Sequence, residues 1–263
     1  MNLKLPFPDR YTVLNSDSKR RNIRCILQYK GTAYKGWQVQ PDVLTIQGVV
    51  EKCLYKMTRE KIRVISSGRT DAGVHALMQV INFFTSVEIP SYGFLRGLNA
   101  LLPEDIKVIY VDEVTHSFHA RYCAKSKVYT YVLFNSKLPS PFWHEYSLRV
   151  FPELDLKAMK MAVSFLEGEH DFSSFMGAGS SVKTRTRHIY RIEIFTDGPF
   201  VFIEIEANGF LKHMVRNIVG TLVEIGHHKR RPEEMNRILM ACDRSLAGPT
   251  APAQGLFLKE VKY

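Results

Sequence analysis

The sequence predicts an α+β protein of two subdomains, each running β-α-β-β-α-β in the manner of a ferredoxin-like unit. Two observations favour this fold class. Short apolar segments alternate with amphipathic segments of helical period, and the same order occurs loosely twice along the 263 residues. A chain of this length also fits two domains. We expect a flexible N-terminal arm over residues 1–20, a first subdomain over 21–114 and a second over 115–263.

In the first half, apolar segments predict strands over residues 23–29, 62–65, 79–84 and 106–111. Two helices are expected between them. The first begins after Thr45, because a threonine oxygen can accept a hydrogen bond from a backbone N–H of the first turn. Its apolar residues recur at helical spacing along one stripe, and the second helix covers residues 91–101.

In the second half, residues 129–134 form a predicted strand, and Asp155 can cap a helix that we expect Gly168 to close. Two strands over 187–195 and 200–207 make a hairpin across a Thr-Asp-Gly-Pro turn. The most strongly periodic helix covers residues 211–225, a further helix opens at Pro232, and a strand over 255–261 ends the chain.

The chain is strongly basic, with 36 Lys and Arg against 26 Asp and Glu and a net charge of +10. This excess indicates a polyanionic partner, with RNA or DNA first and an anionic membrane surface second. Basic residues cluster at 19–21, 183–187 and 227–231, each of which could equally be a solvated face. The absence of an apolar run of about 20 residues, of a signal-peptide pattern and of paired cysteines predicts a cytoplasmic protein.

Residues 66–76 interrupt the strand pattern and are the first candidate site. They place Arg69, Asp71 and His75 close together in sequence, around Gly68 and Gly73. Glycines allow sharp turns and close approach of a ligand, and loops held by strands often carry reactive side chains. The alternative is a surface turn in which Asp71 bonds its own backbone.

Further candidates lie in the second half. Lys212 and Arg216 are four residues apart on the predicted long helix and would share one face with Gly220, either toward an anion or as a solvated flank. Tyr129 and Tyr131 share one face of a strand, where they could pack in the core or stack on a base. His116 and His119 lack a third ligand at matching spacing. With no phosphate-binding or dinucleotide motif present, we expect no metal and no cofactor.

These residues resemble a known family. Residues 68–76, Gly-Arg-Thr-Asp-Ala-Gly-Val-His-Ala, resemble the active-site motif of the TruA family of tRNA pseudouridine synthases. Five further segments look like family motifs in the right order, so that the resemblance covers nearly the whole chain from about Arg24 to Leu258. They are residues 31–48, 119–131, 171–175, 210–220 and 247–256.

The resemblance implies that the protein converts uridines at positions 38 to 40, in the anticodon stem-loop of tRNA, into pseudouridine. By family position Asp71 is the nucleophile, Arg216 its cationic partner, and Tyr129 the residue that stacks on the target uracil and relays a proton. Arg69 would help displace the target base, and His75 and Lys212 would support substrate binding. The family acts without a cofactor and as a homodimer.

The fold implied is the pseudouridine synthase fold, in which two ferredoxin-like or RRM-like subdomains join their antiparallel sheets around a central cleft. Three alternatives remain beside this interpretation. The chain could be a non-catalytic RNA-binding protein of tandem ferredoxin-like modules, or a member of the same family acting at another RNA site. The third alternative, a metal-dependent nuclease, lacks a ligand cluster.

Overall fold

The computed structural model describes residues 20–179 and 182–263, which form two compact units. Unit 1 contains the described residues up to Lys125 together with Leu258–Tyr263, and unit 2 contains Ser126–Phe257. Except for Arg20, the predicted N-terminal arm lies outside the described residues. The sequence placed the subdomain boundary after residue 114 and left the last strand in the second subdomain. In the structure, most of that strand belongs to unit 1, where it neighbours a strand of the N-terminal half.

The sheet of unit 1 runs in the order β4-β1-β3-β10. Its strands are β1 (Arg21–Tyr29), β3 (His75–Thr85), β4 (Ile106–Val114) and β10 (Leu256–Lys262), and the two-residue β2 (Ile65–Ser66) also pairs with β3. Both β3 and β4 are antiparallel to β1. Strand β1 lies between β3 and β4, and its residues 22–27 are buried on both faces, including the polar Asn22 and Arg24.

Two helices pack on one face of this sheet, α1 (Ile46–Thr58) and α2 (Ser91–Leu101). Thr45 caps α1 as predicted, since its hydroxyl accepts a hydrogen bond from the backbone N–H of Gly48. Phe94 of α2 meets Phe83 of β3 edge to face, with ring centroids 5.5 Å apart. The order β1-α1-β2-β3-α2-β4 confirms the predicted ferredoxin-like unit.

The sheet of unit 2 runs in the order β5-β9-β8-β7, with the short β6 on β5. The bounds are β5 (Ser126–Asn135), β6 (Leu148–Val150), β7 (Gly168–Asp171), β8 (Thr186–Asp197) and β9 (Phe200–Ala207). Strands β8 and β9 form the predicted hairpin, whose turn places Gly198 at a φ of +54°. Such a conformation favours glycine.

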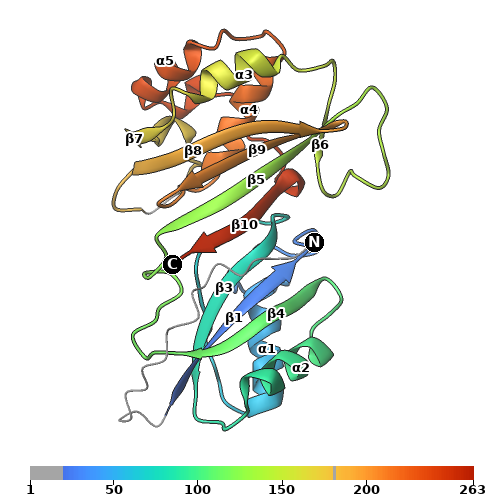
Figure 1. Ribbon diagram of the computed structural model, residues 1–263, viewed down its shortest axis with the longest axis vertical. Helices are drawn as coiled ribbons and strands as arrows, with labels where there is room; N and C mark the ends of the chain where they lie inside the picture. The colour runs from blue at the N-terminus through green and yellow to red at the C-terminus, as the bar shows by residue number, and fades with distance from the viewer. Residues whose placement is uncertain (1–19, 180–181) are drawn as a thin grey trace. The chain divides into compact units, whose positions relative to one another are not determined.

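Three helices complete unit 2, namely α3 (Leu156–Val163), α4 (Met214–Gly226) and α5 (Glu234–Ala241). They pack on one another beside the β5-β9-β8 sheet (Figure 1). Asp155 caps α3 as predicted, accepting from the backbone N–H of Ala158 at 2.9 Å. Short 3-10 turns lie at Ser173–Phe175, Arg244–Leu246 and Ala253–Gly255.

Some predicted boundaries were wrong. Strand β3 begins at His75 rather than at residue 79, so His75 is a strand residue. Helix α3 ends at Val163, and Gly168 instead opens β7 with a φ of +97°. Helix α4 begins at Met214 because His213 adopts a left-handed conformation with a φ of 59°, which ends the helical geometry on its N-terminal side.

Gly220 in α4 lies against the segment that follows α5. A Cβ atom built at Gly220 would stand 1.7 Å from the carbonyl oxygen of Pro249. This oxygen is a main-chain atom, so it cannot move aside by a change of rotamer. Gly97 in α2 differs, because its Cβ would meet the flexible Met57 side chain, with the terminal methyl at 2.4 Å and the sulfur at 3.1 Å, and no backbone atom among its three nearest neighbours. The interior glycine of α4 is therefore required by close packing.

We expect Gly220→Ala to lower the free energy of unfolding by about 1–2 kcal/mol, since overpacking outweighs the roughly 1 kcal/mol gained in helix propensity. Gly97→Ala, the matched change in α2, should leave the free energy of unfolding within about 1 kcal/mol of wild type or raise it, because Met57 can move. Urea unfolding of both variants measures this difference. Equal unfolding free energies for the two variants would contradict the packing argument.

Candidate functional site

The loop between β2 and β3, residues 67–74, carries the first candidate residues. Its backbone leaves the sheet at Ser67, whose N–H donates to the carbonyl of Val80. The loop ends in a turn, in which the N–H of Val74 donates to the carbonyl of Asp71 at 3.1 Å. Gly73 has a φ of +79° within this turn. Asp71 is half-buried and Arg69 is exposed, so both can meet a ligand.

Buried polar side chains support this loop from the sheet side. The hydroxyls of Tyr29 and Thr70 lie 2.8 Å apart, and the side-chain amide of Gln79 donates to the carbonyl of Gly68 at 2.9 Å. Ser67 donates in turn to the Gln79 oxygen at 2.6 Å. Burial raises the pKa of the Tyr29 hydroxyl well above its ordinary value, so this group stays neutral. These hydrogen bonds hold the side chain of Thr70, the residue before Asp71.

The segment over residues 31–37 holds the same loop through its backbone. The N–H of Trp37 donates to the carbonyl of Thr70 at 3.0 Å, and a Cβ at Gly36, whose φ is +89°, would stand 2.8 Å from that carbonyl oxygen. At Gly31 a Cβ would lie 2.0 Å from the carbonyl oxygen of Val74. Both glycines of the segment over residues 31–37 are therefore explained by close backbone contact with the loop.

His75 follows the loop as the first residue of β3. It is 1% exposed, and its Nδ1 accepts a hydrogen bond from the N–H of Gly31 at 3.1 Å. This geometry fits the ordering of the loop better than contact with a substrate.

In unit 2, Arg216 lies half-buried in the first turn of α4. Its Nε donates to the carbonyl of Ala251 at 2.7 Å, and the N–H of Ala251 donates back to the Arg216 carbonyl at 3.0 Å. The Tyr131 hydroxyl donates nearby to the carbonyl of Pro252. Burial raises the pKa of Tyr131 well above its usual value, an effect that the positive charge of Arg216 opposes.

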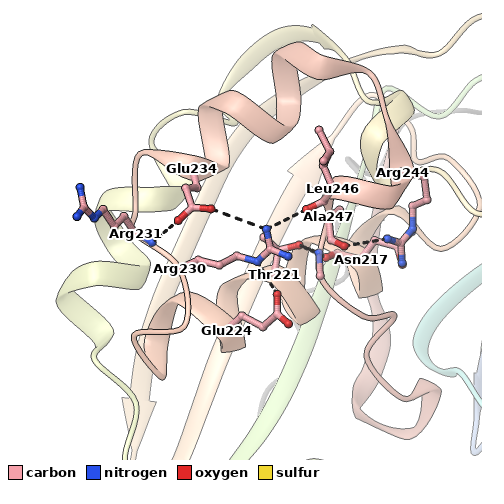
Figure 2. Close-up of polar contacts among 10 residues, drawn as sticks. Asn217, Thr221, Glu224, Arg230, Arg231, Glu234, Arg244, Leu246 and Ala247 are labelled. Carbon is pink, nitrogen blue, oxygen red and sulfur yellow. Dashed lines mark hydrogen bonds and ion pairs between the residues drawn. The ribbon is translucent and has the colours of Figure 1, made fainter.

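A second polar network fixes the segment that holds Arg216, and Figure 2 shows the part of it around Asn217, Thr221 and Arg244. The buried Asn217 accepts on its side-chain oxygen from Thr250 at 2.6 Å and from Arg244 at 3.1 Å, and it donates to the carbonyl of Phe175. Thr221, one turn later, accepts from the N–H of Gly248. Residues 247–251 are thus tied to α4 at Arg216, Asn217 and Thr221.

Figure 2 also shows that the basic cluster over residues 227–231 is partly structural. Arg230 donates to Glu224 at 2.6 Å and to the carbonyl of Leu246 at 2.9 Å. Its guanidinium therefore anchors the segment after α5.

Tyr129 and Lys212 occupy different surroundings in unit 2. Tyr129 is 8% exposed and meets Phe210 edge to face, with centroids 5.0 Å apart. Lys212 precedes α4 and donates its Nζ to the carbonyl of Ala178 at 2.9 Å. The prediction that Lys212 and Arg216 share one helix face is therefore wrong, because the left-handed His213 separates Lys212 from the helix.

The structure groups the predicted site residues into two sets. Arg69, Asp71 and His75 lie on or beside one loop of unit 1, whereas Tyr129, Lys212 and Arg216 belong to unit 2. Sequence reasoning missed the polar residues that support each set. A signal was present for two of them, since Gln79 and Asn217 are amides within otherwise apolar segments and both are fully buried.

The described residues contain neither a metal-ligand cluster nor a helix that could span a membrane. Over residues 20–179 and 182–263, no three His, Cys, Asp or Glu side chains are grouped as a metal site would require. In the same part of the chain, every helix is too short or too polar to cross a membrane.

Comparison with known proteins identifies the family. The family described as tRNA pseudouridine synthase matches residues 25–123 and 162–263. A tRNA pseudouridine synthase A of Moorella thermoacetica is 46% identical over 92% of this chain and 99% of its own length. A protein of the same name from Brevibacillus brevis is 47% identical over 92% of this chain and all of its own length. The chain belongs to the tRNA pseudouridine synthase family.

Membership of this family makes the protein a tRNA-modifying isomerase, and it identifies the α+β fold as that of the pseudouridine synthases, as the sequence predicted. Among solved structures, a chain of a Cbf5-Nop10-Gar1 complex aligns with a TM-score of 0.34 and 16% identity, covering 81% of this chain and 56% of that one. That similarity is too distant to carry an argument.

We expect Gly36→Ala to reduce tRNA isomerisation at least about tenfold, because the new Cβ must push the Thr70 carbonyl and thereby the adjacent Asp71. Gly198→Ala is the matched control. It also places alanine at a positive φ, but in the β8–β9 turn, where nothing lies within 4 Å of the new Cβ. Initial rates of pseudouridine formation test the pair. Equal rates for both variants would mean that this contact does not position the loop.

Proposed function

We propose that this protein isomerises uridine to pseudouridine at positions 38 to 40, in the anticodon stem-loop of tRNA, with Asp71 as the nucleophile. One observation carries the proposal. Asp71 stands half-buried on a loop that is held on one side by Tyr29 and Gln79 and on the other by the backbone of residues 31–37. A carboxylate carried on a loop held in this way is positioned for attack on a bound ring or sugar. The relatives named above, described as tRNA pseudouridine synthases, support the substrate.

The reaction needs no redox partner. The bond between N1 of uracil and C1′ of ribose breaks, the uracil rotates, and C5 forms the new bond to C1′. The proton lost from C5 balances the proton gained at N1, so that substrate and product have the same composition. Asp71 would hold the intermediate covalently, whether it attacks C1′, attacks C6 or captures a glycal.

Arg216 is the proposed cationic partner of Asp71. Its Nε is committed to the carbonyl of Ala251, which fixes the plane of the guanidinium. A planar guanidinium held in this way can receive a carboxylate through two parallel hydrogen bonds. Asn217, Thr250 and Arg244 would preserve this orientation by holding residues 247–251.

The remaining roles follow the same proposal. Tyr129 would stack on the target uracil and relay the proton removed from the sugar or from C5, and the exposed Arg69 would help to displace the target base from its stem. Lys212 would contribute positive charge toward the RNA, and His75 would order the loop. We also propose a homodimer that shares one tRNA between its subunits, and a cytoplasmic location.

Asp71→Asn should lower pseudouridine formation about 1000-fold or more while tRNA affinity stays near that of wild type. The amide keeps the shape of the carboxylate but is not a comparable nucleophile, and phosphate contacts supply most of the affinity. Asp197→Asn, the same change at an exposed position of β8, should have no effect. Single-turnover assays on prefolded tRNA in the presence of chelator measure both variants.

Turnover by Asp71→Asn within tenfold of wild type would overturn the assignment of the nucleophile. If the wild-type enzyme binds tRNA and forms no pseudouridine, the alternative of a non-catalytic RNA-binding protein is favoured instead.

Arg216→Ala should lower turnover about 100-fold, and Arg216→Lys should recover only part of it, because lysine keeps the charge and loses both the Ala251 bond and the planar fork. Arg237→Ala, at an exposed position of α5, is the control. If Asp71 and Arg216 act as a pair, the double variant Asp71→Asn with Arg216→Ala should be no slower than Asp71→Asn alone. Additive losses in the double-mutant cycle would contradict the pairing.

A further inference from the structure

The segment that follows β4, residues 116–125, presents an aromatic side chain to solvent in an ordered setting. Tyr122 is 77% exposed, although its neighbour Ala120 is fully buried. The ten residues, His-Ser-Phe-His-Ala-Arg-Tyr-Cys-Ala-Lys, contain two cations and no carboxylate.

The ring of Tyr122 is held by its own neighbours. It stacks on the imidazole of His119 with centroids 4.2 Å apart and planes 29° apart, and the guanidinium of Arg121 lies 5.9 Å from its centroid. The Nδ1 of His119 accepts from the backbone N–H groups of both Arg121 and Tyr122 at 3.2 Å. The imidazole therefore cannot rotate away without losing two hydrogen bonds.

The turn beneath this stack is anchored to the sheet of unit 1. The N–H of Ala120 donates to the side-chain oxygen of Asn82 in β3 at 2.9 Å, and the carbonyl of Ala120 accepts from the hydroxyl of Tyr263 at 2.6 Å. Asn82 donates in turn to Asn22 of β1 at 2.8 Å, and both asparagines are fully buried. An exposed ring on a turn that is held this firmly loses little conformational entropy when a flat ligand stacks on it.

The two histidines of this segment have different neighbours. The ring of His116 packs against Phe84 with centroids 5.5 Å apart, while His119 stacks on Tyr122. Each imidazole thus has its own aromatic partner.

We propose that Tyr122 is a stacking platform for an unpaired base of the tRNA substrate, with Arg121 supplying charge toward the neighbouring phosphate. An aromatic ring flanked by a cation, in a segment without a carboxylate of its own, is typical of a surface that binds single-stranded nucleic acid. The inference rests on the proposed function for its partner. Asn82 lies seven residues from His75 along β3, or about 23 Å, so this base is distinct from the target uridine beside Asp71.

The test compares substitutions at Tyr122 by tRNA affinity and by the split between KM and kcat. Tyr122→Ala and Tyr122→Leu should weaken tRNA binding at least about fivefold, the lower end for one stacked base. KM should rise correspondingly, and kcat at saturating tRNA should be unchanged. Tyr122→Phe should bind like wild type, because it keeps the ring and its stack. Tyr92→Ala, at a 68% exposed position of α2, is the matched control for removing a surface tyrosine.

Tyr122→Ala binding within twofold of wild type would overturn the proposal, and so would Tyr122→Leu binding as well as Tyr122→Phe. A fall in kcat without a change in affinity would also contradict it. The proposed function is tested separately, because it fails only if the wild-type protein forms no pseudouridine. Urea unfolding of Tyr122→Ala should match that of wild type, since the ring is mostly exposed.

Discussion

The backbone of the loop over residues 67–74 lies so close to the segment over residues 31–37 that two positions cannot carry a side chain. The contact is between main-chain atoms, with Gly31 against the Val74 carbonyl and Gly36 against the Thr70 carbonyl. Main-chain contact fixes a loop more firmly than side-chain contact, because it removes the rotamers through which a side chain would yield. The placement of Asp71, and therefore the chemistry proposed for it, depends on this packing.

In unit 2, glycines also allow close main-chain packing around Arg216. Gly220 approaches the Pro249 carbonyl, and Gly248 lies against the backbone of Thr221, so that residues 247–251 pack directly on α4. Asn217 then satisfies three polar partners from one buried side chain. A buried amide with its partners in place specifies one arrangement, since any shift leaves a donor or acceptor without a partner. Each unit thus fixes its charged residue through glycine contacts and a buried amide.

Most of the fold could be predicted from the sequence, because period and capping are local properties. Thr45 and Asp155 cap the helices expected of them, and the turn before Pro199 joins the expected hairpin. Boundaries set by a single backbone conformation could not be predicted. The left-handed conformation of His213 makes α4 begin after Lys212 and not before it, and the neighbouring residue types do not predict that conformation.

The candidate site was predicted unevenly for a related reason. Residues that carry charge stand out in a sequence, so Arg69, Asp71 and Arg216 were identified as candidates, in part through the family resemblance. Residues that hold them act through contacts between distant segments, as Tyr29 does with Thr70 across 41 positions. Such partners become visible only when the fold brings the segments together.

The return of strand β10 to unit 1 bears on the order in which the parts of that unit are synthesised. Strand β10 neighbours β3, the N–H of Lys125 donates to the carbonyl of Lys262, and the Tyr263 hydroxyl donates to Ala120. A nascent chain that has emerged only as far as residue 255 lacks this strand, so the edge of β3 next to it stays open. The unit that carries Asp71 is therefore built from residues made before unit 2 and residues made after it, and a chain interrupted at residue 255 keeps an unpaired strand edge in that unit.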